Sequence, residues 1–405
     1  MTTPDPSVPA LNAVFDAPAH RPTTAARLRA ARWATRALFG ILGVLGGVWG
    51  AHIPSVKARY GLDEAVLSAV LFSAAVGAVG SVFFAGRFIG RLGARRASLI
   101  TGLVLCSALG TALLWPSVWV LMLASVAFGM SMSVFDVTIN SEGTALERDG
   151  GQPIMGNLHG CFSLGAMAGA ALAAALLRAQ VPAAAQLLGV ALVLASGLAL
   201  ANRSMLDARP APPKPGEAGE EQRHFVWPRG LLLLIGLLIF AGMTAEGVMY
   251  DWCVLYLKQE VGMPQDQAAL GYAVFAGAMA AARFGGDFLR ARFSEQALLR
   301  SCAALTAVAM AVVLASGSAW VSLLGYALVG VGLAPIVPIL FNAASRVPGS
   351  SSAAAIAAVS SIGYSGFLVG PPLIGAIAHA WSLTAAMTVV VVAASALAIG
   401  ARRVD

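Results

Sequence analysis

Along this chain, long apolar stretches alternate with short polar segments. Residues 301–345 contain no Asp, Glu, Lys or Arg, and residues 347–401 contain none either. No single soluble core is large enough to hide several such stretches, whereas each has the length of two helices across a hydrocarbon layer of about 30 Å. The pattern therefore predicts a chain that folds in a lipid bilayer.

The lengths of the apolar runs decide between helices and a barrel. Runs near 20 residues favour spanning helices, because the strands of a barrel would give alternating segments of about 10 residues. We expect an all-α membrane protein with twelve transmembrane helices. Their predicted ranges are 37–55, 65–86, 98–115, 118–140, 153–177, 184–202, 230–257, 267–289, 297–316, 319–341, 353–378 and 381–400.

Composition agrees with this prediction and excludes several other classes. The chain is 58% hydrophobic and 11% charged, whereas soluble domains have about 25% charged residues. Its four cysteines all fall in predicted helices at unrelated spacings, which favours neither a disulfide framework nor a zinc site. We find no metal-ligand cluster and no nucleotide loop, and we expect no cofactor. The cysteines are Cys106, Cys161, Cys253 and Cys302.

The positive charges indicate the orientation. The net charge is +7, with 26 Lys and Arg residues. If both termini are cytoplasmic, four of these residues lie on the outer side: Lys57, Arg59, Arg178 and Lys258. The positive-inside rule explains this asymmetry, so the basic balance reflects topology and does not predict a nucleic-acid partner.

Polar segments divide the chain into four parts. Residues 1–32 have no apolar core of a signal peptide, and we expect a disordered cytoplasmic tail there. Residues 204–229 are rich in Pro, Gly and charge, which favours a flexible cytoplasmic linker. Six-helix bundles are predicted on either side of that linker, at 33–203 and 230–401.

The two predicted bundles carry a similar loop after their second helix. Residues 86–96 (GRFIGRLGARR) and 282–293 (ARFGGDFLRARF) are both basic and rich in Gly. Two six-helix halves with such loops resemble the plan of the major facilitator superfamily. The first loop departs from the family's motif, because Gly90 stands where Asp is usual. Asp287 is the candidate for the equivalent cytoplasmic latch in the second half.

Four further stretches resemble the YbjJ-like inner-membrane branch of that superfamily, which is distantly similar to fucose permeases. His52 departs from the branch, where Arg is expected. The resemblance implies a secondary transporter in a bacterial inner membrane, usually a monomer. The stretches are 49–54 (WGAHIP), 136–140 (DVTIN) with 158–163 (LHGCFS), 246–252 (EGVMYDW) and 363–375 (GYSGFLVGPPLIG).

Acids within membrane helices are candidate functional groups, because a charge at the bilayer centre costs about 2.5–3.5 kcal/mol on insertion scales. Asp136 lies in the cytoplasmic third of its helix, one turn before Asn140 on the same face. The next helix opens with His159, and we expect the three side chains to meet. An Asp beside a His could handle protons or bind the solute.

A cytoplasmic gate is the alternative interpretation of this group. In that case Asp136 and its neighbours would clasp basic side chains when the cytoplasmic side closes. The candidate gate residues are Arg91, Arg95, Glu142, Glu147, Arg283 and Asp287.

A second acidic group lies in the seventh predicted helix. Glu246 is about 24 Å from the start of that helix, with Tyr250 one turn later and able to hydrogen-bond to it. Asp251 and Trp252 follow, and an acid beside an aromatic ring is suited to a sugar or a cation. Alternatively, Asp251 closes the outer gate and Trp252 belongs to the interfacial aromatic belt.

Two further features come from the first and eleventh predicted helices. His52 follows fifteen apolar residues and could face Glu246 or Asp251 across the two halves. The eleventh helix contains a Gly- and Pro-rich run that we interpret as a bend or a packing device. The residues of this run are Gly366, Gly370, Pro371 and Pro372.

These residues favour a secondary transporter that moves a small polar solute, such as a sugar, by alternating access. A proton is the expected coupling ion, because carboxylates and histidines are available, and symport is favoured over export. The alternatives are a proton-coupled exporter of amphipathic compounds and a membrane sensor that does not transport. An enzyme is not expected, because no nucleophile with a positioned base is found.

Overall fold

The computed structural model describes residues 24–206, 228–286, 288, 292–348 and 352–404. In these ranges the chain is helical, with no strand, so the predicted all-α fold is confirmed. The first half (residues 25–206) contains α1 (Ala25–Tyr60), α2 (Glu64–Leu92), α3 (Ala94–Thr111), α4 (Val118–Gly150), α5 (Met155–Arg178) and α6 (Ala183–Asn202). The second half (residues 228–404) contains α7 (Gly230–Gln259), α8 (Gln265–Phe284), α10 (Glu295–Ser316), α11 (Ala319–Leu333), α12 (Ile336–Ser345), α13 (Ser352–Ala380), α14 (Leu383–Gly400) and the short 3-10 helix η3 (Ala401–Arg403).

Short polar residues set the helix ends. The side chain of Asp63 accepts a hydrogen bond from the backbone N–H of Val66 (2.8 Å) and caps the start of α2. Gly61 ends α1 with φ at +61°, a left-handed conformation that is open to glycine at little cost. Between α1 and α2 the chain therefore reverses its direction within three residues.

Ten helices in the described ranges are long and apolar enough to cross a membrane, and Glu64–Ser81 of α2 is one of them. The number is eleven if the end of α2 (Phe84–Leu92) and α3 together count as one bent span. The pair bends by 118° beside Gly93. The predicted span 319–341 is divided into α11 and α12 at Pro335, and α8 is not among the ten. The predicted number of twelve spans therefore stays a prediction.

The helices extend further than the apolar runs do. α1 begins at Ala25, so residues 25–32 of the predicted tail are helical, and residues 1–23 lie outside the described part of the chain. α4 continues to Gly150, ten residues past its predicted end. Most of the predicted linker, residues 207–227, lies outside the described residues, and the division into two bundles stays a proposal.

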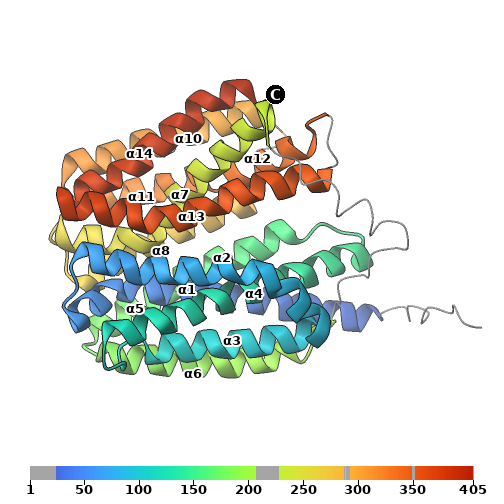
Figure 1. Cartoon of the computed structure of the whole chain (residues 1–405), viewed down its shortest axis with the longest axis horizontal. Helices are drawn as coiled ribbons and strands as arrows, with labels where there is room; N and C mark the ends of the chain where they lie inside the picture. Colours follow the sequence, from blue (N-terminus) through green and yellow to red (C-terminus); the bar gives the residue numbers. More distant parts are fainter. Residues whose placement is uncertain (1–23, 207–227, 287, 289–291, 349–351, 405) are drawn as a thin grey trace, which may run out of the picture.

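The two halves repeat one packing scheme. In the first half α1 packs on α5, α2 on α4 and α3 on α6; in the second half α7 packs on α13, α8 on α11 and α10 on α14. Figure 1 shows the first half below the second, with both ends of the described chain toward the same end of the molecule. Between the halves the main contacts are α5 with α8 and α2 with α13, which are equivalent pairs under the same repeat.

Glycines allow the closest helix pairs. A Cβ atom at Gly43 or Gly47 of α1 would lie 2.0 or 2.1 Å from a backbone oxygen of α5. On α5, a Cβ atom at Gly165 would lie 2.2 Å from the carbonyl oxygen of Gly40. Small residues of this kind let helix backbones approach closely in membranes. They hold α5 against α1, and α5 in turn carries Ser163, whose hydroxyl accepts a hydrogen bond from Arg283 of α8.

Candidate functional site

An ion pair lies near the middle of the molecule. Glu246 is one residue beyond the midpoint of α7, and Oε1 of its carboxylate is 3.1 Å from Nη2 of Arg283 on the last turn of α8. The two side chains are only 13% and 17% exposed. Two charges removed from water in this way are stable only when paired and hydrogen-bonded, so each residue needs the other.

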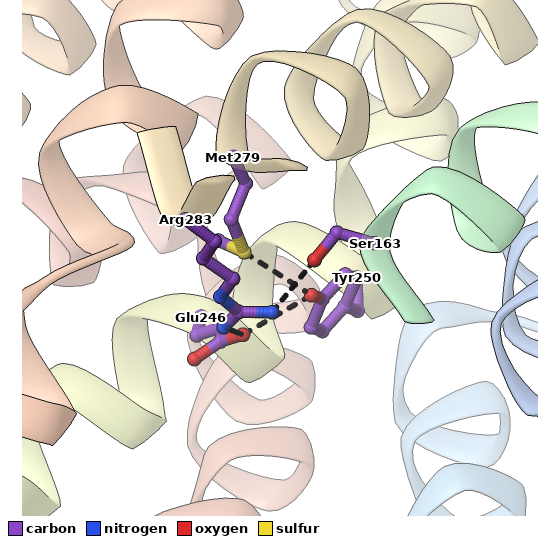
Figure 2. Close-up of polar contacts among 5 residues, drawn as sticks. All are labelled: Ser163, Glu246, Tyr250, Met279 and Arg283. Atoms are coloured by element: carbon purple, nitrogen blue, oxygen red, sulfur yellow. Dashed lines mark hydrogen bonds and ion pairs between the residues drawn. The ribbon is translucent and has the colours of Figure 1, made fainter. Parts of the chain in front are cut away.

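The same arginine joins the two halves. Nη1 of Arg283 donates a hydrogen bond of 2.7 Å to the hydroxyl oxygen of Ser163, which belongs to α5 of the first half. Figure 2 shows the guanidinium between the serine and the glutamate. Because a planar guanidinium presents several donors in a fixed arrangement, one side chain can bridge both acceptors. We call Ser163, Glu246, Tyr250 and Arg283 the central cluster.

Tyr250 completes the central cluster. Its hydroxyl lies 3.1 Å from Oε1 of Glu246, to which it donates a hydrogen bond, and 3.5 Å from the sulfur of Met279. Its ring packs against Tyr272 and Phe275 of α8, with ring centroids 5.6 and 5.4 Å away. One carboxylate oxygen therefore accepts from both a cation and a phenol, and any change in its charge affects both donors.

Asp136 and Asn140 form a second polar pair, on α4. The side-chain nitrogen of Asn140 donates to Oδ1 of Asp136 at 3.0 Å and to the backbone oxygen of the same residue at 2.9 Å. Tyr364 of α13, in the other half, is 52% exposed and lies within electrostatic range of the aspartate. Because Tyr364 belongs to the second half, this pair lies near the boundary between the halves.

The structure does not bring His159 to Asp136. In the described part of the chain the two share no hydrogen bond or ion pair, and the histidine ring instead contacts the edge of Phe39 (centroids 5.4 Å apart). The reason is the length of α4: Asp136 is about 21 Å before its end, whereas His159 is about 6 Å after the start of α5. The predicted meeting of the three side chains is therefore not seen.

Two predicted gate acids hold the first half together instead. Glu142 is fully buried and accepts a hydrogen bond from the backbone N–H of Leu206 after α6. Glu147 accepts from the backbone N–H groups of Ile154 and Met155 (2.6 and 2.8 Å) at the start of α5. These three bonds lie within the first half. Those of Glu147 satisfy backbone donors at the start of α5, and that of Glu142 ties the segment after α6 to α4.

The remaining gate candidates occupy different places. Arg91 is exposed on the last turn of α2 and Arg95 is exposed on the first turn of α3. Asp287 lies outside the described residues. Arg283 is part of the central cluster, where its partners are Glu246 and Ser163.

The other predicted site residues lie in the helix interiors. His52 is fully buried and bonds to Gln186 of α6 and Ser55 of α1, so it faces neither Glu246 nor Asp251. Asp251 is half-buried. Trp252 is fully buried in the core, and it therefore does not lie in a lipid-facing aromatic belt.

The Gly- and Pro-rich run lies inside the continuous helix α13. Gly366 packs closely against α7, where an added Cβ would lie 2.7 Å from the backbone oxygen of Phe240. The backbone oxygen of Pro371 accepts a hydrogen bond from Ser68 of α2 (2.9 Å). Gly370 has open space beside it. This run therefore packs against α7 and α2, and a bend at Pro371 and Pro372 stays a prediction.

Three residues that make contacts between the halves were not predicted from the sequence, namely Ser163, Ser55 and Gln265. Ser163 lies in one of the quoted stretches, but a serine in an apolar helix gives no signal of its own. Ser55 and Gln265 are ordinary polar residues near helix ends, and their pairing depends on how the two halves pack.

Comparisons with known proteins agree on the fold. A family model described as the Major Facilitator Superfamily matches residues 34–365. The chain is 32% identical over 370 residues to a protein of Yersinia pestis described as an uncharacterized MFS-type transporter, covering 91% of this chain and 94% of that protein. It is also 32% identical over 356 residues to the membrane protein MosC of Rhizobium meliloti, covering 87% of this chain and 85% of that one.

Solved structures show the same fold at low identity. The nucleoside transporter NupG superposes with a TM-score of 0.75 at 14% identity, covering 92% of this chain and 98% of NupG. The transporter FucP in its outward conformation gives a TM-score of 0.63 at 17% identity, with the same coverage of 92% and 98%.

Proposed function

Because this chain belongs to the Major Facilitator Superfamily, a class of secondary transporters, we propose that it moves a small polar organic solute by proton-coupled symport. The central cluster is the observation that carries this proposal. Glu246 lies near the middle of α7 and pairs with Arg283 of α8, which in turn bonds to Ser163 of the other half. Transporters of this fold bind substrate near the middle of the membrane, between their two halves, and this supports a role of the central cluster in binding. The proposed location is a bacterial inner membrane, with both termini in the cytoplasm.

Protonation of Glu246 would change the partners of Arg283. A proton on the carboxyl removes the negative charge that balances the guanidinium, and it leaves a buried cation with Ser163 as its remaining partner. An unpaired buried charge is costly. A solute that offers oxygen acceptors to Arg283 removes that cost. Proton and solute therefore favour each other's binding, which is the condition for symport.

The polar side chains near the two halves' interface indicate the class of solute. Ser163, Tyr250, Asp136 and Asn140 offer hydroxyl, carboxylate and amide groups at the two halves. Because these groups include both hydrogen-bond donors and acceptors, they suit a hydroxyl-rich organic metabolite such as a sugar. Two proteins of the same fold are a nucleoside transporter and a fucose–proton symporter, and their hydroxyl-rich solutes belong to the class proposed here.

Reconstitution into liposomes tests the proposal directly. The purified protein is placed in vesicles that contain a pH-sensitive dye and is exposed to sugars, nucleosides, sugar acids, amino acids and cationic drugs. We expect one class of polar solute to acidify the vesicle interior. The Glu246→Gln variant should abolish this acidification, because its amide cannot carry the coupled proton.

A matched control is available in the same half. Glu295 also forms an ion pair, with Arg346, but that pair is exposed, and Glu295→Gln should keep proton uptake. Alkalinisation of the interior by drugs would indicate an exporter and overturn the proposal. Solute uptake without any proton movement would overturn the coupling.

A further inference from the structure

A chain of hydrogen bonds joins the two halves away from the central cluster. It lies at the outer end of the molecule, where α1 and α7 end and α8 begins, the end that the positive charges predict to face away from the cytoplasm. Gln265 at the start of α8 donates from Nε2 to the hydroxyl oxygen of Ser55 (2.7 Å) and to the backbone oxygen of Ala51 (3.1 Å). Its Oε1 accepts from Nζ of Lys258 (3.0 Å).

The series of hydrogen bonds extends from Ser55 through His52 to Gln186 of α6 in the first half. Nε2 of Gln186 donates to the backbone oxygen of Val181 (2.8 Å), so Oε1 of that glutamine is left to accept. Nε2 of His52 lies 3.0 Å from that oxygen and donates to it. Nδ1 of His52 then accepts from the hydroxyl of Ser55 (3.2 Å), because Oγ of Ser55 already accepts from Gln265.

The four hydrogen bonds between side chains therefore run in one consistent direction, each with one donor and one acceptor. A connected polar network of this kind favours a single arrangement of the groups that form it. The arrangement needs both halves in place, because Gln265 belongs to α8 and Ser55 to α1. Alternating access requires the outer end to open, so these bonds must break once in each cycle.

The same segment of α1 touches the central cluster. An added Cβ at Gly50 would lie 2.4 Å from the ring of Tyr272 and 3.1 Å from the backbone oxygen of Tyr250. Tyr250 is bonded to Glu246, and Ala51, the next residue after Gly50, accepts from Gln265. Direct contacts thus lead from the central glutamate to the bond between the halves.

We propose that Gln265, through its bonds to Ser55 and Ala51, is the latch that keeps the outer end closed, and that it is released when Tyr250 moves against Gly50. One part of this inference rests on the proposed function, namely that protonation of Glu246 makes Tyr250 move. The existence of the latch depends on the contacts of α1 and α8 alone.

Distances between spin labels at the outer end test the latch. The labels are placed at Ala179 after α5 and at Ala380 at the end of α13, both exposed, in a chain whose four native cysteines are replaced. The wild-type distribution is expected to show one short distance. Gln265→Ala removes three hydrogen bonds, two of which join the halves. Because each lost bond between the halves weakens the closed arrangement, the ratio of long to short distances should rise by about tenfold or more.

Control variants separate the latch from a general loss of structure. Gln267 is exposed two residues later on the same helix, and Gln267→Ala should leave the distances unchanged. Ser55→Ala should behave as Gln265→Ala does, whereas Ser55→Thr keeps the hydroxyl and should behave as wild type. Gly50→Ala crowds Tyr272 and should also lengthen the distances.

These measurements need no solute, so they are independent of transport. A Gln265→Ala distribution identical to that of wild type would overturn the latch, whatever the transport assay shows. An unchanged distribution for folded Gly50→Ala would overturn the release by Tyr250. If Gln265→Ala opens the outer end while no solute moves protons in liposomes, the latch stands and the proposed function fails.

Discussion

Arg283 bonds to oxygen atoms in both halves of the molecule, at Ser163 and at Glu246. It must leave at least one of them when the halves move apart. The stability of the site therefore depends strongly on this one side chain, which is largely buried. A lysine in its place would reach one acceptor at a time, because its charge is a single point.

Stability measurements test the central ion pair. Arg283→Gln leaves the buried carboxylate of Glu246 unpaired, and we expect a loss of about 3–5 kcal/mol in the free energy of unfolding. The double variant with Glu246→Gln should recover most of that loss, because no buried charge remains. Thermal unfolding in detergent provides the comparison.

The exposed pair of Arg346 and Glu295 serves as the reference. Its side chains are 60% and 33% exposed, and Arg346→Gln should change stability by about 0–1 kcal/mol. If Arg283→Gln proves no more destabilising than Arg346→Gln, the central pair is not buried in the way described.

At the scale of single residues, the sequence identified the charges but not their partners. Glu246 stands out because few acids interrupt the apolar runs, and Tyr250 follows from helical spacing. Arg283 is 37 residues after Glu246 in the chain, and the two side chains meet only because α7 packs against α8. The same limit applies to His52, whose expected partner lay in the other half and whose observed partner is Gln186.

At the scale of helices, contact between glycines and backbone atoms fixes how closely α1 and α5 pack. Gly47→Ala would place a methyl group 2.1 Å from the backbone oxygen of Ala166. Backbone atoms cannot move aside as a side chain can, so we expect a loss of about 1–3 kcal/mol. Thermal unfolding in detergent measures it.

Gly80→Ala on α2 is the matched control, because no atom lies within 4 Å of the added Cβ. This variant should keep or slightly raise stability, since alanine favours a helix more than glycine does. Equal effects of the two substitutions would contradict the close packing of α1 on α5.

Helix positions were predicted better than helix ends. Apolar runs mark where a helix crosses lipid, but α1 and α4 continue for several turns into polar sequence. Hydropathy gives no signal there, because a helix outside the bilayer is stabilised by caps and tertiary contacts. The 118° bend beside Gly93 and the break at Pro335 are likewise set by backbone conformation and lie within or beside apolar runs.

At the scale of the whole molecule, two sets of bonds hold the halves together. At the outer end Gln265 binds α1, and Ser68 binds the backbone of α13. Near the middle Arg283 binds Ser163. The contact through Gly50 connects these two levels. A change of charge at Glu246 can thus reach the outer end through residues that touch one another.

The central claim is that Glu246 carries the coupled proton. Once the solute is identified, its exchange at equal concentration and pH on both sides is compared with its accumulation under an inward proton gradient. We predict that Glu246→Gln keeps exchange, because the halves still move, and loses accumulation. Accumulation by this variant at the wild-type level would contradict the account.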